Sequence, residues 1–264
     1  MKWPFGFWIL DFGLRIEDFG LRIDCFADRC DDAPCDDAPC PRPHAPCPMP
    51  NYPTYIYLHG FASSPQSAKA KYLRDGFQTR QIDMKVPDLN QGDFSHLTLT
   101  RHLKQVAAEF PPAPAAVAII GSSFGGLTAA WLGQQHRQVQ RLVLLAPAFQ
   151  FLCHWLPTLG EEKMRRWQAG GYLPVYHYGE KESLPLHYDF VLDMRQYPEQ
   201  QLQAPIPTLI MHGRHDEVIP IQASRDFAAT RPWVRLVELD SDHALANVLD
   251  EIWQEICRFL DVPD

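Results

Sequence analysis

The sequence predicts an α/β fold, with a mostly parallel central sheet covered by helices on both faces. Short apolar runs rich in β-branched and aromatic residues, typical of strands, recur between residues 54 and 239. Segments with helical periodicity alternate with them, and such strand–helix–strand units form right-handed crossovers between parallel strands. A glycine-rich turn joins the most apolar run to a helical segment at residues 116–130, and we expect the domain to be organised around it.

The predicted elements follow one another in a regular order. The strands expected to build the sheet are residues 54–58, 82–86, 117–120, 141–146, 206–212 and 233–239. The expected helices are residues 66–77, 95–110, 127–135, 221–230 and 246–260. The second of these helices has Leu99, Leu103, Val106 and Ala107 on one face, and prolines follow it directly.

Residues 149–203 interrupt this alternation. The segment has no long clean period and is rich in aromatic residues: Trp155, Trp167, Tyr172, Tyr176, Tyr178, Tyr188 and Tyr197. Connections of this length are usually functional, so one interpretation is a lid-like insertion over a binding pocket. The alternative is a set of helices that complete the core, and the sequence favours neither.

Residues 1–50 differ in composition from the rest of the chain. Two short tandem repeats, at residues 11–24 and 31–40, precede proline-rich sequence. This composition cannot close a core, so we predict a disordered extension, with the folded domain at residues 51–264. Met49 directly precedes that domain, and our hypothesis is that it is the natural start, with residues 1–48 either absent from the native protein or a disordered extension.

Most cysteines lie in the repeat segment: Cys25, Cys30, Cys35, Cys40 and Cys47. They include no C-x2-C pair, and their spacing of five is that of the repeat, so neither a metal site nor disulfides are predicted. Only Cys153 and Cys257 fall in the domain, which favours a reducing compartment.

The overall charge and hydropathy exclude two classes of partner. A net charge of −8 argues against a nucleic-acid groove or an anionic membrane surface as the main target. No apolar run approaches the roughly 20 residues that a membrane-spanning helix needs. These features favour a small-molecule substrate and leave the oligomeric state open.

The glycine-rich turn contains a candidate nucleophile. Gly121, Ser123 and Gly125 fit G-x-S-x-G, in which a serine sits on a sharp strand-to-helix turn with its hydroxyl exposed. The glycines remove Cβ clashes, so that the backbone can bend and the helix can pack close to the strand. The pattern alone is weak, but an apolar strand before it and a helix after it support the assignment.

A serine hydroxyl needs a base within hydrogen-bond reach and a third group that orients the base. Asp216 follows the predicted strand at 206–212, and His243 follows the strand at 233–239. The chain order Ser123, Asp216, His243 is the one expected for an α/β-hydrolase. Because the carboxyl ends of parallel strands meet at one edge of the sheet, we predict that these residues form a catalytic triad.

The remaining candidates for the acid and the base fit less well. Asp240 and Asp242 lie too close to the histidine along the chain, and Asp193 lies in the insertion. His212 and His215 flank the acid, where packing or hydrogen bonding is the expected role.

The proposed chemistry is acyl transfer, which requires no metal or organic cofactor. The loop after an early strand and the residue after the nucleophile each supply one oxyanion-hole N–H in this architecture. That assigns the backbone amides of Phe61 and Phe124. His59, in the same loop as Phe61, is expected to organise the loop through hydrogen bonds.

Four segments together resemble the YqiA/YcfP-like esterases of the α/β-hydrolase superfamily: YLHGFASSPQSAKA at 57–70, GSSFGG at 121–126, HGRHDEVIP at 212–220 and SDHAL at 241–245. The likeness covers the chain from about residue 52 to its end. It implies a cytoplasmic esterase acting on short acyl esters or thioesters, with Ser123, Asp216 and His243 as its triad. The aromatic insertion leaves the acyl-chain preference open.

Two alternatives accompany the esterase prediction. An acyl-thioester hydrolase or a small peptidase would use the same triad, since the leaving-group preference depends on the shape of the pocket. The second alternative is a non-catalytic binding protein that keeps the hydrolase fold. Such proteins usually lack a triad residue, and all three residues are present here.

Overall fold

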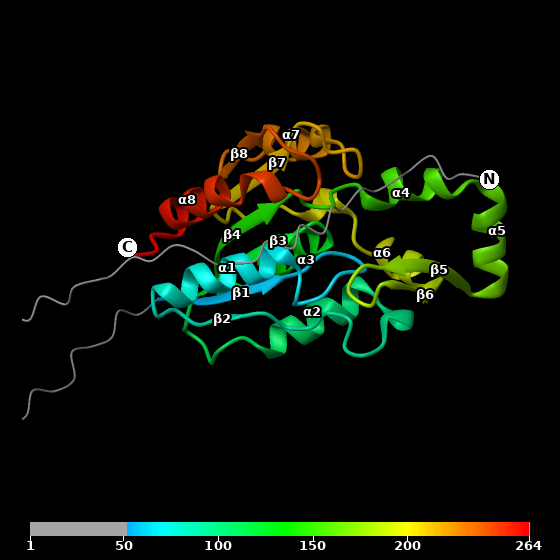
Figure 1. The fold of residues 1–264 in the computed structure, drawn as a ribbon, viewed down its shortest axis with the longest axis horizontal. Helices are drawn as coiled ribbons and strands as arrows, with labels where there is room; N and C mark the ends of the chain where they lie inside the picture. The colour runs from blue at the N-terminus through cyan, green and yellow to red at the C-terminus, as the bar shows by residue number, and fades with distance from the viewer. Residues whose placement is uncertain (1–51, 264) are drawn as a thin grey trace, which may run out of the picture. The chain divides into compact units, whose positions relative to one another are not determined.

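The computed structural model describes residues 52–263, so the predictions for the repeat segment lie outside the described residues. Six strands form one sheet in the order β2-β1-β3-β4-β7-β8 (Figure 1). They are β1 (Thr54–Leu58), β2 (Met84–Lys85), β3 (Val117–Ser122), β4 (Val139–Leu145), β7 (Thr208–Gly213) and β8 (Val234–Leu239). Every neighbouring pair in this sheet is parallel, which confirms the predicted α/β class.

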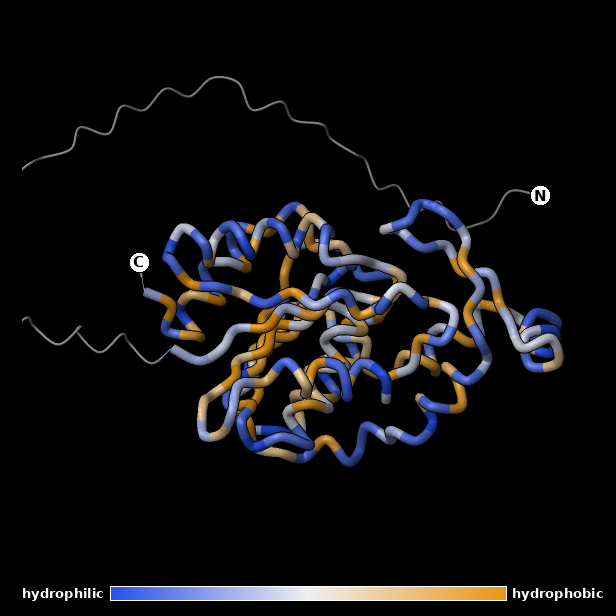
Figure 2. Tube along the Cα trace, turned by 90° about the horizontal axis from the view of Figure 1, so that it is seen from below, coloured by the Kyte–Doolittle hydropathy of each residue, from blue (hydrophilic) through white to orange (hydrophobic). Residues whose placement is uncertain are grey.

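Helices cover both faces of the sheet, as predicted. They are α1 (Ala68–Thr79), α2 (Leu99–Ala108), α3 (Phe124–Gln135), α7 (Ile221–Ala229) and α8 (Leu249–Leu260). Ile119 of β3 packs in the core cluster that includes residues of α2, α3 and α7, whereas its neighbour Ile120 packs in the cluster with α1 and α8. The central strands are therefore buried on both sides, and Figure 2 shows the apolar residues gathered along them.

Several predicted boundaries differ from those in the structure. The helix expected at 95–110 is divided into a 3₁₀ turn (Phe94–His96) and α2, because the Thr98 side chain caps α2 by accepting the N–H of Arg101. The final helix is likewise preceded by a 3₁₀ turn (Ala246–Val248). The predicted second strand is reduced to two residues at the sheet edge.

The insertion is regular, and it contains a hairpin that the sequence did not reveal. It comprises α4 (Phe151–Leu159), α5 (Glu161–Gly170), β5 (Tyr172–His177), β6 (Glu182–His187), α6 (Asp189–Met194) and a 3₁₀ turn (Glu199–Gln201). Strands β5 and β6 pair antiparallel, with Pro174 directly opposite Pro185. Proline normally argues against a strand, but both strands here are edges of a two-stranded sheet, where it is tolerated.

The insertion lies beyond the carboxyl ends of the parallel strands (Figure 1). Part of it completes the core, because Trp167, Leu186 and Phe190 are almost fully buried. Among the described residues, no helix is long and apolar enough to cross a membrane.

Candidate active site

Ser123 occupies a strained turn between β3 and α3. Its φ of 53° and ψ of −118° are rarely adopted by a residue with a side chain. A Cβ atom at Gly121 would lie 2.3 Å from the carbonyl oxygen of Gly125, and one at Gly125 would lie 2.2 Å from that of Leu58. Both positions therefore require glycine, because the turn packs against its own helix and against the end of β1.

A hydrogen-bonded line across three loops joins Ser123, His243 and Asp216. The Oγ of Ser123 lies 3.1 Å from Nε2 of His243, and Nδ1 of His243 lies 2.7 Å from Oδ2 of Asp216. The side chain of Asp216 is fully buried, whereas that of His243 is 23% exposed. The structure thus brings together the three residues that the sequence singled out, with the serine end of the line accessible.

Four hydrogen bonds converge on the carboxylate of Asp216. His243 and His212 bind Oδ2, and the backbone N–H groups of Val218 and Ile219 donate to Oδ1 at 2.8 Å each. Burial alone would raise the pKa of this carboxyl, but the hydrogen bonds from the two histidines outweigh burial and hold the pKa below its usual range. Asp216 is therefore ionised and fixed in orientation at neutral pH.

His212 holds the acid from the side opposite His243. Its Nε2 lies 3.0 Å from both Asp216 Oδ2 and the carbonyl oxygen of Ile219, which are acceptors, so Nε2 carries the proton. Its Nδ1 then accepts the hydroxyl of Ser224 at 2.8 Å. This buried residue forms the hydrogen bonds that the sequence analysis expected of it.

The backbone amides of Phe61 and Phe124 belong to the two segments that flank the nucleophile. Phe124 is the first residue of α3, so its N–H has no acceptor within the helix and lies at the positive end of the helix dipole. A Cβ atom at Gly60 would lie 3.3 Å from Cβ of Ser123, so the loop carrying Phe61 runs directly past the serine. Within residues 52–263, neither amide donates to another backbone group.

The side chain of Phe61 forms the centre of an aromatic cluster beside this site. Its ring centroid lies 5.3–6.1 Å from those of five rings: Phe94, Phe124, Phe151, Trp155 and Phe190. The last three come from α4 and α6 of the insertion. The insertion therefore builds an apolar wall next to the two amides.

The other acidic candidates have separate roles. Asp193 accepts the N–H and the hydroxyl of Thr100, which ties the insertion to the first turn of α2. Asp240 pairs with His215 on the surface at 2.9 Å, and Asp242 accepts backbone N–H groups of its own turn. Of these acidic candidates, Asp216 is the one whose carboxylate contacts His243.

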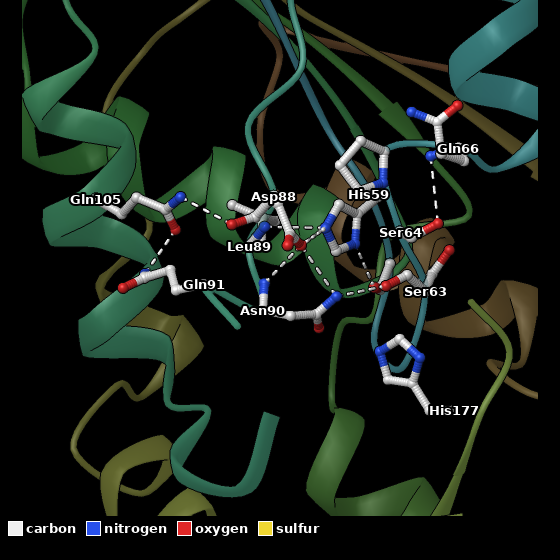
Figure 3. A network of polar contacts seen from close by, with 12 residues as sticks. His59, Ser63, Ser64, Gln66, Asp88, Leu89, Asn90, Gln91, Gln105 and His177 are labelled. Carbon is white, nitrogen blue, oxygen red and sulfur yellow. Dashed lines mark hydrogen bonds and ion pairs between the residues drawn. The ribbon is translucent and has the colours of Figure 1, made fainter. Parts of the chain in front are cut away.

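His59 organises the loop after β1, as its place in the sequence suggested. Its buried ring accepts the N–H of Leu89 at Nε2, 3.0 Å away, and its Nδ1 lies 3.0 Å from the carbonyl oxygen of Gly60 (Figure 3). The segment at 88–90, which binds this loop through Leu89 and Asn90, was not predicted from the sequence. The only signal for it was the turn pair Pro87 and Asp88 after the second strand.

No group of three His, Cys, Asp or Glu side chains in the part of the chain that the structure describes is arranged to hold a metal ion. The cysteines of the repeat segment lie outside that part.

The model of a family described as "Uncharacterised protein family (UPF0227)" matches residues 54–261. The chain belongs to this family. Membership confirms the resemblance to the YqiA/YcfP-like proteins of the α/β-hydrolase superfamily. The matched residues include the glycine-rich turn and all three residues of the hydrogen-bonded line.

Solved structures similar to this UPF0227 member share its fold. Est1E from Butyrivibrio proteoclasticus, solved with ferulic acid bound, aligns with a TM-score of 0.66 at 19% identity over 80% of this chain and 90% of its own. A protein from Agrobacterium vitis S4 aligns with a TM-score of 0.69 at 24% identity over 80% and 88%. Mouse α/β-hydrolase domain-containing protein 10 aligns with a TM-score of 0.66 at 18% identity over 79% and 90%. These likenesses establish the α/β-hydrolase fold.

Proposed function

We propose that this protein is a serine esterase that hydrolyses short acyl esters through a covalent acyl-enzyme. The observation that carries the proposal is the line of hydrogen bonds from Asp216 through His243 to Ser123, with distances of 2.7 and 3.1 Å. A neutral hydroxyl becomes an effective nucleophile when a histidine takes its proton and a carboxylate orients that histidine.

In the first step, Nε2 of His243 takes the proton of Ser123 as Oγ attacks the ester carbonyl carbon. The ionised Asp216 keeps the proton of the neutral imidazole on Nδ1 and stabilises the imidazolium that forms. The tetrahedral intermediate then collapses, the imidazolium gives its proton to the departing alkoxide, and the alcohol leaves.

The oxyanion of this intermediate is stabilised by the amides of Phe61 and Phe124. Each donor of this kind contributes roughly 100- to 1000-fold to the rate, because it is oriented before charge develops. The amino end of α3 adds a favourable dipole at the same point. In the second step, water attacks the acyl-enzyme with His243 as the base, and the carboxylic acid leaves. The mechanism uses no metal or organic cofactor.

The aromatic wall around Phe61 favours esters whose acyl group is apolar and of limited length. Rings from the insertion lie at centroid distances of 5.3–5.6 Å from Phe61, and we expect them to limit the length of the acyl chain that the site accepts. We also propose a cytoplasmic location, in line with Cys153, an exposed cysteine that forms no disulfide.

Hydrolysis of p-nitrophenyl esters of increasing acyl length tests the proposal. We expect the full-length protein to prefer short chains and Ser123→Ala, folded by circular dichroism, to lose at least about 1000-fold in kcat/KM. An inactive wild type, or a variant that keeps its rate, would overturn the esterase assignment. The same enzyme assayed on acyl-CoA and amide substrates separates the esterase from a thioesterase or a peptidase, since the proposal predicts that esters react fastest.

A further inference from the structure

The loop after β1, residues 59–64, has a conformation that its own sequence does not favour. Ala62 has a φ of +51°, in the left-handed region that a residue with a Cβ atom rarely adopts. Such a conformation persists only where surrounding contacts hold it. The contacts that hold this loop are therefore relevant to the position of the Phe61 amide.

The first contact acts on the peptide unit that contains the Phe61 N–H. Nε2 of His59 accepts the N–H of Leu89, so Nδ1 carries the proton and donates to the carbonyl oxygen of Gly60. That carbonyl and the Phe61 N–H belong to one planar trans peptide and point in opposite directions. Holding the oxygen on the outer side therefore directs the N–H inward.

The second contact comes from the side chain of Asn90, which is 8% exposed. Its Nδ2 donates to the carbonyl oxygen of Ser63 at 2.8 Å and to Oδ1 of Asp88 at 3.1 Å. The same Asp88 oxygen accepts the backbone N–H of Asn90 at 3.1 Å, and the Nδ2 group is fixed between Asp88 and Ser63 (Figure 3). Asn90 thus links the segment after β2 to the loop across 27 residues of sequence.

The third contact comes from the hairpin of the insertion. The backbone N–H of Tyr178 donates to the carbonyl oxygen of Ala62 at 2.8 Å. A Cβ atom at Gly179 would lie 2.9 Å from Cβ of Ser64, so the hairpin tip packs closely on the loop. The loop is therefore held from two sides, and Asn90 is the side chain that holds it from the side of β2.

We infer that Asn90 is a positioning residue, which holds the loop so that the Phe61 N–H meets the oxyanion. This inference rests on the proposed esterase function. Without the bond to Ser63, the strained loop is free to relax, and the Phe61 N–H moves away from the developing charge. Because the oxyanion is absent from the bound ester and develops only as Ser123 attacks it, the loss falls on kcat and leaves KM nearly unchanged.

Asn90→Ala and Asn90→Asp test the inference in the full-length protein. Asp keeps the shape of the side chain but presents an acceptor to the Ser63 oxygen, so both variants lose the bond. We expect kcat to fall about 10- to 100-fold with KM within about threefold. The matched control is Gln105→Ala, because Gln105 binds the backbone of the same segment at the Asp88 oxygen, 2.9 Å away, and its other hydrogen bond among the described residues is with Gln91, outside the loop. We expect it to keep kcat within about twofold.

Affinity for a short-chain trifluoromethyl ketone provides a second readout, since its serine adduct carries the same oxyanion. We expect this affinity to fall in parallel with kcat/KM in the Asn90 variants, assayed at a temperature at which circular dichroism shows all variants folded. Unchanged kcat in either Asn90 variant, or an equal loss in Gln105→Ala, would refute the positioning role. Failure of the esterase function itself would show separately, as a Ser123→Ala variant that retains activity.

Discussion

Gly125 shows how little space the turn around Ser123 leaves. A Cβ atom there would lie 2.2 Å from the carbonyl oxygen of Leu58, which is backbone and cannot move aside. We predict that Gly125→Ala lowers the free energy of unfolding by at least about 3 kcal/mol, or prevents folding. The matched control is Gly170→Ala in α5, where a Cβ atom meets nothing within 4 Å. Urea unfolding compares the two, and equal stabilities would show that the turn is less tightly packed than the structure indicates.

The low pKa of Asp216 determines how the free energy of unfolding changes in acid. Its pKa lies below its usual range in the folded protein, because hydrogen bonds to the carboxylate outweigh burial. Its ionised form therefore contributes stability that is fully present above about pH 4, the pKa of an aspartate in an unfolded chain, and is lost as the pH falls toward the lower folded pKa.

We predict that the free energy of unfolding of the wild type falls more steeply between pH 5 and pH 2 than that of Asp216→Asn. Urea titrations at several pH values in that range provide the measurement. Parallel curves for the two proteins would contradict the assignment of a hydrogen-bonded, ionised acid.

At the scale of elements, the stability of the start of α4 depends on pH through Glu199. Its side chain accepts the backbone N–H of Gln150, which directly precedes α4. Burial raises the pKa of Glu199 to about 7, against the opposing effects of this hydrogen bond and of Arg231. The folded state therefore retains a proton that the unfolded state loses, and stability falls as the pH rises from about 4.5 to about 7.

We predict that Glu199→Gln removes this part of the pH dependence. The wild type is expected to lose more stability than the variant between pH 4.5 and pH 7.5, measured by thermal unfolding in matched buffers. An identical loss in both proteins would show that the carboxyl titrates at its ordinary pKa.

A substitution at Trp155 of α4 tests whether the aromatic wall sets the acyl-chain preference. Its ring lies 5.4 Å from that of Phe61, and it is only partly buried. We predict that Trp155→Ala shifts the preferred acyl chain to longer esters, by at least about two carbons, because each buried CH₂ is worth roughly 0.8 kcal/mol and the variant makes room for more of them. Cys153→Ala, an exposed change on the same helix, is expected to keep the wild-type preference. An unchanged optimum in Trp155→Ala would place the acyl group elsewhere.

The elements of the sheet were predictable because their signals are local. The strands at 54–58 and 233–239 and the helix at 221–230 appear within one residue of the predicted bounds. The hairpin of the insertion was not predictable, because Pro174 and Pro185 resemble strand breakers and their tolerance depends on both strands being edges.

For the whole molecule, the sequence predicts which residues end strands but not which strands are neighbours. Strands β4 and β7 pair in parallel although the whole insertion separates them. Ser123, Asp216 and His243 were recognisable because each follows a strand in a fixed chain order, and parallel strands bring their carboxyl ends together. Asn90 was not recognisable, because its bond to Ser63 arises only when two loops meet in the fold.

The composition of residues 1–48 predicts the behaviour of a shortened chain, because tandem repeats and proline-rich sequence cannot close a core. We predict that a chain beginning at Met49 keeps the ester hydrolysis rate and the melting temperature of the full-length protein. A clear loss of either would show that the repeat segment contributes to the domain.

Labelling by a fluorophosphonate probe tests the central claim most directly, because the probe reacts only with a serine that a neighbouring base has activated. We predict that one probe molecule binds the wild type, that peptide mapping locates it on Ser123, and that His243→Ala reduces the labelling rate at least about 100-fold. A folded wild type that resists the probe, or a probe found on another residue, would contradict the proposed triad.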